Sequence, residues 1–328
     1  MKRKDFFISV LGMPLLGCVS QASDEIKQVI HARSHDGSAA ILIPGFQGTF
    51  KFMQITDSHI DIADESERDM QEYSQRMHQA YANPRKHFLS DETEKKPLEY
   101  FEEALGKAVS EKVDLLLLTG DIVNFPSAVT VNALVTKLKQ AGIPWLYTCG
   151  NHDWHYEGME GSADVLRRTW TDKVLSPFYQ GQNPLFYSKR IGGINFVGID
   201  NSTYQVNNEQ LCFLKGQLKR DGPIVLFSHI PYYFRGVQGI FCGSPEWGAK
   251  NDKNFKIERR ERWPESSNNQ ATVEFIETIY RATDKIIAIV TGHTHRSSVL
   301  FTGNLCQYVS YATSNGASGI FKIQTGSE

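Results

Sequence analysis

Short runs of apolar residues recur along the chain and alternate with longer stretches in which apolar positions repeat every three or four residues. Such runs are typical of buried strands, and the longer stretches are typical of amphipathic helices. Five of the runs end directly before a short polar motif, and they cover residues 52–55, 113–118, 143–149, 224–227 and 286–290. This alternation of strands and helices predicts an α/β fold.

The longer periodic stretches predict helices between these strands. Before residue 113, one helical face carries Leu98, Phe101, Leu105, Ala108 and Val109, which indicates a crossover helix packed on the sheet. Further helices are expected near residues 129–140, 212–218 and 272–282, and further strands at 186–190, 194–199, 299, 306–311 and 319–323. Residues 39–43 and 49–55, separated by Pro-Gly-Phe-Gln-Gly, predict a β-hairpin.

The polar motifs after the five runs carry side chains that metal ions bind. They are Asp57-Ser58-His59, Gly120-Asp121, Gly150-Asn151-His152-Asp153, Ser228-His229 and Gly292-His293-Thr294-His295. In open α/β sheets ligands bind at the carboxyl ends of the strands, so motifs far apart in sequence can meet in one cleft. Carboxylate, carboxamide and imidazole groups together suit Mn, Fe or Zn, whereas Mg and Ca prefer oxygen alone.

The order of these motifs, over roughly residues 48–325, resembles the calcineurin-like metallophosphoesterases. The resemblance implies a four-layer α/β (α+β) fold in which two packed mixed β-sheets are flanked by helices. It implies a phosphomonoesterase or phosphodiesterase that uses two divalent metal ions and metal-bound hydroxide. The implied ligands are Asp57, His59 and His295 at one ion, Asn151, His229 and His293 at the other, and Asp121 as the bridge. His152 would protonate the leaving group, and Asp153 would orient His152.

Asn124 distinguishes the chain from a neighbouring branch of that family. Purple acid phosphatases place a tyrosine three residues after the bridging Asp to bind ferric iron, but Asn124 stands there in this chain. Because a carboxamide cannot supply a phenolate, Mn, Fe(II) or Zn is expected. Asn124 is also a candidate for contact with the substrate.

Two long segments are expected to select the substrate, because long loops in a domain are often functional. They cover residues 60–96 and 231–269. The second carries the candidate substrate-binding residues Tyr232, Tyr233, Arg259 and Arg260, whose guanidinium and aromatic groups suit a phosphate attached to a ring or sugar. The alternative is that the arginines form solvated ion pairs while Trp247 and Trp263 pack the loop against the domain.

The N-terminus has the features of an export signal. Three basic residues precede an apolar stretch at residues 6–17, which is too short to span a bilayer. Leu15-Leu16-Gly17-Cys18 resembles a bacterial lipobox, which predicts lipidation of Cys18; the alternative is cleavage nearby, for example after Ala22. We expect an export signal at 1–22, a tether at 23–37 and one domain at 38–328. The predicted location is the bacterial periplasm or the cell envelope.

Composition and charge restrict the classes of partner that we expect. The 328 residues are 41% hydrophobic and 22% charged with a formal net charge of −2, which is typical of a soluble globular domain. Nothing resembles the basic stripe of a general nucleic-acid binder. The expected partner is therefore a phosphorylated small molecule, lipid or sugar, with membrane contact only through the lipid anchor. The alternatives are a nuclease or a metal-holding envelope scaffold.

Overall fold

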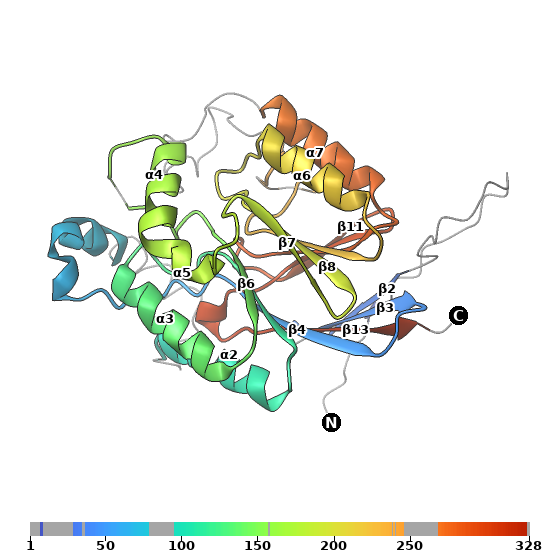
Figure 1. Cartoon of the computed structure of the whole chain (residues 1–328), viewed down its shortest axis with the longest axis horizontal. Coiled ribbons are helices and arrows are strands. Elements are labelled where there is room, and N and C mark those ends of the chain that lie inside the picture. The colour runs from blue at the N-terminus through green and yellow to red at the C-terminus, as the bar shows by residue number, and fades with distance from the viewer. Residues whose placement is uncertain are drawn as a thin grey trace.

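Two β-sheets pack face to face with helices outside each of them (Figure 1). The computed structural model describes residues 7–8, 29–34, 37–78, 95–156, 158–237, 239, 241–245 and 268–326. Both sheets contain parallel and antiparallel pairs. The predicted four-layer α/β architecture is therefore confirmed.

The first sheet has the strand order β1-β2-β3-β13-β4-β5-β6. Its strands are β1 Phe7–Ile8, β2 Ile30–Arg33, β3 Ala39–Pro44, β13 Ile320–Gly326, β4 Thr49–Ile55, β5 Leu115–Thr119 and β6 Trp145–Thr148. The pairs β4–β5 and β5–β6 are parallel. Every residue of β5 and β6 is buried. Both strands lie in the parallel part of the sheet, which is covered on both faces, and this explains their mainly apolar sequences.

The second sheet has the order β11-β12-β10-β9-β8-β7. Its strands are β11 Ser298–Thr302, β12 Leu305–Val309, β10 Ile286–Thr291, β9 Ile224–Phe227, β8 Ile194–Ile199 and β7 Phe186–Ile191. The four central strands are parallel, and β7 and β11 close the two edges in antiparallel pairs. The strands expected from the apolar runs are confirmed.

Helices cover the outer faces of both sheets (Figure 1). They include α2 Pro97–Ser110, α3 Ala128–Ala141, α4 Ala163–Trp170, α5 Ser176–Tyr179, α6 Asn208–Leu218 and α7 Gln270–Arg281, with shorter helical turns at η1 Glu65–Met70, η2 Thr171–Leu175 and η4 Thr313–Asn315. The helices expected near 98–109, 129–140, 212–218 and 272–282 are confirmed. Among the described residues, none of the helices has both the length and the apolar composition needed to cross a bilayer.

Aromatic side chains join the two sheets. Phe52 of β4 stacks on Phe321 of β13 with ring centroids 4.7 Å apart, and it meets Phe196 of β8 edge-on at 5.6 Å. All three rings are fully buried. Aromatic pairs prefer these stacked and edge-to-face arrangements. The Phe52–Phe321 stack lies within the first sheet, and the Phe52–Phe196 contact joins that sheet to the second.

The expected hairpin between residues 39–43 and 49–55 is wrong. Both segments are strands, but β13 lies between them, parallel to β3 and antiparallel to β4. The turn sequence shows only that the chain reverses direction. It cannot show that a strand from the far end of the chain takes the hydrogen bonds of both partners.

Part of the expected tether also belongs to the domain. Residues 30–33 form β2, which pairs with β3. The His31 ring lies 2.8 Å from the Tyr308 hydroxyl, and Arg33 donates to the Ser298 carbonyl at 2.8 Å. Four residues are too few for a clear alternation of apolar and polar positions. Within the expected export signal, Phe7–Ile8 pairs with β2; Cys18 lies outside the described residues, and export and lipidation stay predictions.

Candidate metal centre

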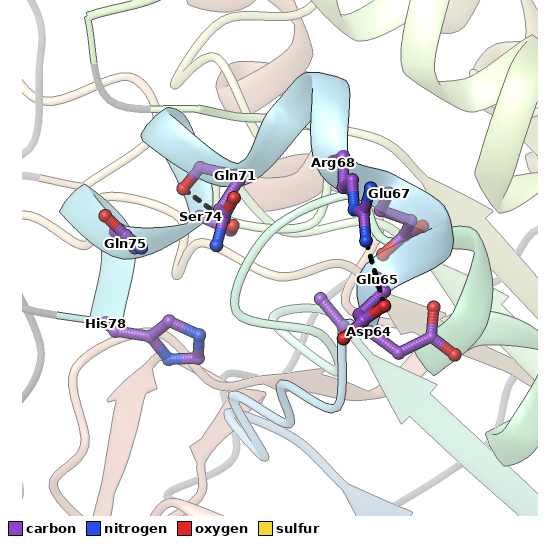
Figure 2. A pocket seen from close by; sticks show the side chains of 9 residues that line it. Asp64, Glu65, Glu67, Arg68, Gln71, Ser74, Gln75 and His78 are labelled. Carbon is purple, nitrogen blue, oxygen red and sulfur yellow. Dashed lines mark hydrogen bonds and ion pairs between the residues drawn. The ribbon is translucent and has the colours of Figure 1, made fainter.

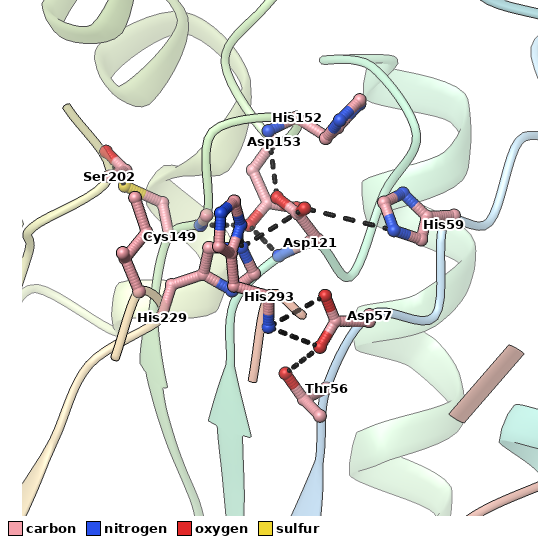
Figure 3. Close-up of polar contacts among 12 residues, drawn as sticks. Thr56, Asp57, His59, Asp121, Cys149, His152, Asp153, Ser202, His229 and His293 are labelled. Atoms are coloured by element: carbon pink, nitrogen blue, oxygen red, sulfur yellow. Dashed lines mark hydrogen bonds and ion pairs between the residues drawn. The ribbon is translucent and has the colours of Figure 1, made fainter. Parts of the chain in front are cut away.

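The five motifs meet where β4, β5 and β6 of one sheet approach β9 and β10 of the other. The Gln54 amide donates to Thr119 Oγ1 at 2.7 Å and to the Thr291 carbonyl at 3.0 Å, so it links the two sheets beneath the motifs. Above it, the backbone N–H of Asp57 donates to the carbonyl of Gly120 at 3.0 Å. The predicted ligands thus come from both sheets but share one rigid frame (Figure 3).

The first group of converging side chains is Asp57, His59 and His295. The Nε2 atoms of the two histidines are 3.0 Å apart, and His295 Nε2 lies 3.3 Å from Asp57 Oδ1. Ligand atoms that each lie about 2.0 to 2.2 Å from a shared Zn²⁺ ion are separated by distances of this order. The three side chains can therefore hold one ion.

The second group is Asp121, His229 and His293. His229 Nε2 lies 3.1 Å from Asp121 Oδ2 and 3.3 Å from His293 Nδ1. The neighbouring Asn151 has a buried Oδ1 with no hydrogen-bond partner among the described residues. A buried acceptor without a donor is costly, and a cation held by this group would satisfy it.

Asp121 stands between the two groups (Figure 3). The same oxygen, Oδ2, that lies 3.1 Å from His229 lies 3.9 Å from Nε2 of His59. One carboxylate thus faces a histidine of each group, which is the position required of a bridge. His152 also comes close, because its ring centroid lies 4.9 Å from that of His59 and its ligand atom falls near those of His59 and Asp121.

The electrostatics of the centre favour a cation. Burial lowers the pKa of His229, but the charge and hydrogen bond of Asp121, the charge of Asp57 and the Thr119 carbonyl together raise it to about 9. Burial raises the pKa of Asp57, but the hydrogen bond and charge of His295, the charge of His229 and the Thr56 hydroxyl together lower it to about 2. Carboxylates that stabilise positive charge this strongly, beside imidazoles, form a donor set that fits divalent metal ions.

Hydrogen bonds behind the ligands fix their orientation. Nδ1 of His229 lies 2.8 Å from the Thr119 carbonyl, so Nδ1 carries the proton and Nε2 is left to face the centre. Asp57 accepts from the Thr56 hydroxyl at 2.7 Å and from the backbone N–H of His293 at 2.9 Å. Such partners of metal ligands typically contribute about 10- to 100-fold to metal affinity.

The backbone at the ligands is strained. Five of the predicted ligands have positive φ angles, namely Asp57 (51°), His59 (45°), Asp121 (50°), His293 (70°) and His295 (52°). A non-glycine residue in this region costs on the order of 1 to 3 kcal/mol and persists only where the surroundings impose it. This strain is a sign of a functional site that is independent of the chemistry of the side chains.

Gly150 and Gly292 allow the ligands to approach the backbone. A Cβ at Gly150 would overlap Oδ1 of Asp121, and a Cβ at Gly292 would overlap Oδ2 of Asp57. The glycines of the third and fifth motifs are therefore required by space, since any side chain there would displace a carboxylate of the centre.

We expect Gly150→Ala to lower metal affinity by at least about 10-fold, because it moves Asp121 and the effect should reach that of losing a supporting contact. Equilibrium dialysis against Mn²⁺ measures the affinity. Gly106→Ala is the matched control, since Gly106 lies in α2 with open space at its Cβ position and alanine should stabilise the helix by about 0.5 to 1 kcal/mol. Unchanged Mn²⁺ binding in Gly150→Ala would contradict the placement of Asp121.

Asp153 holds several backbone groups of the site together. Its carboxylate accepts from the backbone N–H groups of Asp121 (2.9 Å), Val123 (2.9 Å) and Gly150 (2.7 Å), and from the Tyr147 hydroxyl (2.9 Å). Burial and the charge of Asp121 raise its pKa to about 7. Asp153 therefore ties the second and third motifs together through their backbones, and the expectation that it orients His152 stays a prediction.

The candidate substrate residues are spread more widely. Tyr232 is fully buried, and its ring stacks on Phe275 with centroids 5.5 Å apart. The ring therefore packs in the core, and its contact with the substrate stays a prediction. Tyr233 is half-buried, and its carbonyl accepts from Tyr280 at 2.7 Å. Asn124 is buried and donates to Asp61 at 3.1 Å. Arg259 and Arg260 lie outside the described residues.

A pocket of about 500 Å³ lies in the first long segment (Figure 2). Its walls include Asp64, Glu65, Glu67, Arg68 and His78. His78 Nδ1 lies 2.9 Å from Asp61, the carboxylate that also accepts from Asn124. The pocket is thus connected to Asn124, three residues after Asp121, but its carboxylates disfavour a phosphate as its occupant.

A family profile described as calcineurin-like phosphoesterase matches residues 50–297, which include all five motifs. The chain belongs to the calcineurin-like phosphoesterase family. Family membership confirms the resemblance, and it supports a phosphoesterase hydrolase with metal-binding residues at the ends of these strands.

Individual relatives are distant from this phosphoesterase. A Fibrobacter succinogenes protein named "Probable cyclic nucleotide phosphodiesterase" is 27% identical over 182 residues, which cover 55% of this chain and 57% of that protein. A dimetal phosphatase from Danio rerio is 11% identical with a TM-score of 0.49, and the match covers 81% of this chain and 88% of that one. A purple acid phosphatase from yellow lupin (Lupinus luteus) is also 11% identical, with a TM-score of 0.48 and coverage of 90% and 59%.

Some residues of the centre carry no signal in the sequence. Thr56 and Tyr204 contact the motifs, and Gln54 bonds the residues that precede two of them, yet each is a common residue type at an unremarkable position. Only their tertiary contacts reveal them.

Proposed function

We propose that this chain hydrolyses a phosphoester bond of a small phosphorylated molecule at a centre of two divalent metal ions. The observation that carries the proposal is the position of Asp121 Oδ2, between His229 at 3.1 Å and His59 at 3.9 Å. Each of these histidines belongs to a separate group that can hold an ion. Two ions in these groups would bind the phosphoryl oxygens and lower the pKa of a water that acts as the nucleophile.

The protein side chains supply the remaining parts of the reaction. Asp57 and Asp121 balance the charge of the ions, and the strained, hydrogen-bonded loops hold the ligands without reorganisation. His152 is the candidate general acid, since its ring lies beside that of His59 and its backbone N–H donates to Asp121 at 2.8 Å. It would transfer a proton to the oxygen of the leaving group.

Both monoesters and diesters remain candidate substrates. Because the Fibrobacter succinogenes relative is named as a probable cyclic nucleotide phosphodiesterase, a cyclic nucleotide is one of the diesters to test as a substrate. Nucleotides, phosphorylated sugars and lipid head groups carry the same phosphoryl chemistry, and an exported enzyme would meet them outside the inner membrane.

Hydrolysis by the full-length protein tests the proposal. We expect nitrophenyl phosphate, bis-nitrophenyl phosphate or a cyclic nucleotide to be cleaved after loading with Mn²⁺, Zn²⁺ or Fe²⁺, and not after treatment with a chelator. The preferred ester would define the substrate class. Two bound ions without turnover of any of these esters would contradict the proposal and favour a metal-holding scaffold.

A further inference from the structure

The hydroxyl of Tyr204 lies 2.6 Å from Nε2 of His293, and the two rings meet edge-on with centroids 5.4 Å apart. Tyr204 is fully buried and lies in the loop between β8 and α6, outside the five motifs. We propose that Tyr204 is a positioning residue that holds the His293 imidazole for the second ion. This inference rests on the proposed function, because it assumes that both groups hold an ion.

The two nitrogens of His293 have separate partners. Nδ1 lies 3.3 Å from His229 Nε2 and so faces the second group, while Nε2 faces Tyr204. A neutral imidazole has one N–H donor and one acceptor nitrogen. If Nδ1 presents its lone pair to an ion, Nε2 carries the proton and donates to the Tyr204 oxygen. The hydroxyl therefore selects both the tautomer and the ring orientation that metal binding needs.

The loop that carries Tyr204 is itself fixed to the other motifs. The Asn201 amide donates to the carbonyl of Ile230 at 2.6 Å and accepts from its N–H at 3.0 Å, next to His229. The Ser202 hydroxyl accepts from Trp154 Nε1 at 2.9 Å, next to Asp153. Residues 201–204 thus contact the residues that follow the third and fourth motifs, and they contact the fifth motif directly. These contacts hold Tyr204 in place relative to the ligands.

The backbone of Tyr204 is strained in the same manner as the ligands. Its φ is 64°, and its N–H donates to the Asn201 carbonyl at 2.7 Å while its own carbonyl accepts from the Gln205 amide at 3.0 Å. Strain of this kind persists only where neighbouring contacts impose it. Phenylalanine would experience the same backbone strain as tyrosine. Tyr204→Phe therefore removes the hydroxyl without changing the backbone conformation that the loop favours.

The consequence is selective for one ion position. The side chain of His293 belongs to the second group, whereas the first group is made of Asp57, His59 and His295. Asp57 accepts a hydrogen bond from the backbone N–H of His293, which the loss of the Tyr204 hydroxyl does not remove. Loss of the hydroxyl should lower the affinity for the second ion by about 10- to 100-fold, the usual effect of removing the partner of a metal-bound histidine. The first ion should keep its affinity.

Mn²⁺ titration of the chelator-treated full-length protein tests this inference, with bound metal counted directly. We expect the wild type to bind two equivalents of Mn²⁺. In Tyr204→Phe, one equivalent should bind with unchanged affinity and the other with lower affinity. Two unchanged equivalents in Tyr204→Phe, or equal weakening of both, would overturn the inference alone. Fewer than two equivalents in the wild type would overturn the proposed two-ion centre and the inference with it.

Tyr187→Phe is the matched control. The Tyr187 hydroxyl is buried and bonds the backbone of Tyr147, as donor at 2.9 Å and as acceptor at 2.8 Å, and it does not contact any of the predicted ligands among the described residues. We expect a lower melting temperature with both Mn²⁺ affinities intact. If Tyr187→Phe lowers Mn²⁺ affinity as much as Tyr204→Phe does, the effect comes from a general loss of stability and the inference fails.

A double-mutant comparison tests whether Tyr204 acts through His293. In the His293→Ala background, Tyr204→Phe should have no further effect on Mn²⁺ affinity, because the imidazole that it positions is absent. A further loss of affinity in that background would show that Tyr204 acts by another route and would overturn the inference.

Discussion

Replacement of His152 by alanine should reduce turnover by about 10²- to 10⁴-fold, the usual contribution of a general acid, while both metal ions stay bound. The physical reason is the position of the imidazole beside His59 at the edge of the first group, where it can reach a leaving-group oxygen. Turnover of a nitrophenyl ester and metal content measured on the same sample check this prediction.

The leaving group provides a sharper test of the same role. An ester with a basic leaving group needs the proton more than a nitrophenyl ester does, so the loss in His152→Ala should be larger for the alkyl ester. His155→Asn is the control, since His155 lies on the same loop and is buried but falls outside the groups that can hold an ion. Loss of an ion from His152→Ala would instead make His152 a ligand, in keeping with its nearness to His59 and Asp121.

The parts of the fold and the site that could be predicted from the sequence depend on local information. The runs before the second and fifth motifs are almost entirely apolar because every residue of β5 and β10 is buried, whereas the run before Asp57 also contains the buried Gln54. A polar residue directly after such a run must lie at the strand end. Residue type then restricts the chemistry, because carboxylates and imidazoles gathered at strand ends suit few tasks other than metal binding.

The parts that could not be predicted depend on contacts between distant segments. Insertion of β13 between β3 and β4 joins residues about 270 positions apart, and no local pattern encodes that partner. Tyr232 follows His229 closely, yet its ring turns into the core against Phe275. Asp153 is part of a recognisable motif, but its role follows from three backbone N–H groups that only the folded chain brings together.

Asp121→Ala should have the largest effect of any single substitution in the centre. It removes the oxygen that faces both His59 and His229, and with it the acceptor of the His152 N–H. We expect loss of at least one ion. Each ion contributes several kcal/mol to stabilisation of the transition state, and about 1.4 kcal/mol corresponds to tenfold in rate, so turnover should fall by at least about 10³-fold. Metal analysis and ester hydrolysis measure the two effects.

Asp121→Asn separates the charge of Asp121 from its hydrogen bond. The carboxamide can still accept from the His152 N–H through its oxygen, but it lacks the negative charge that raises the pKa of His229. If the charge at a bridge is what retains the ions, Asp121→Asn should lose metal almost as completely as Asp121→Ala while its third motif stays in place. If Asp121→Asn keeps both ions and full turnover, Asp121 acts through the loop and not as a bridge, and the two-ion arrangement would have to be built on the histidines alone.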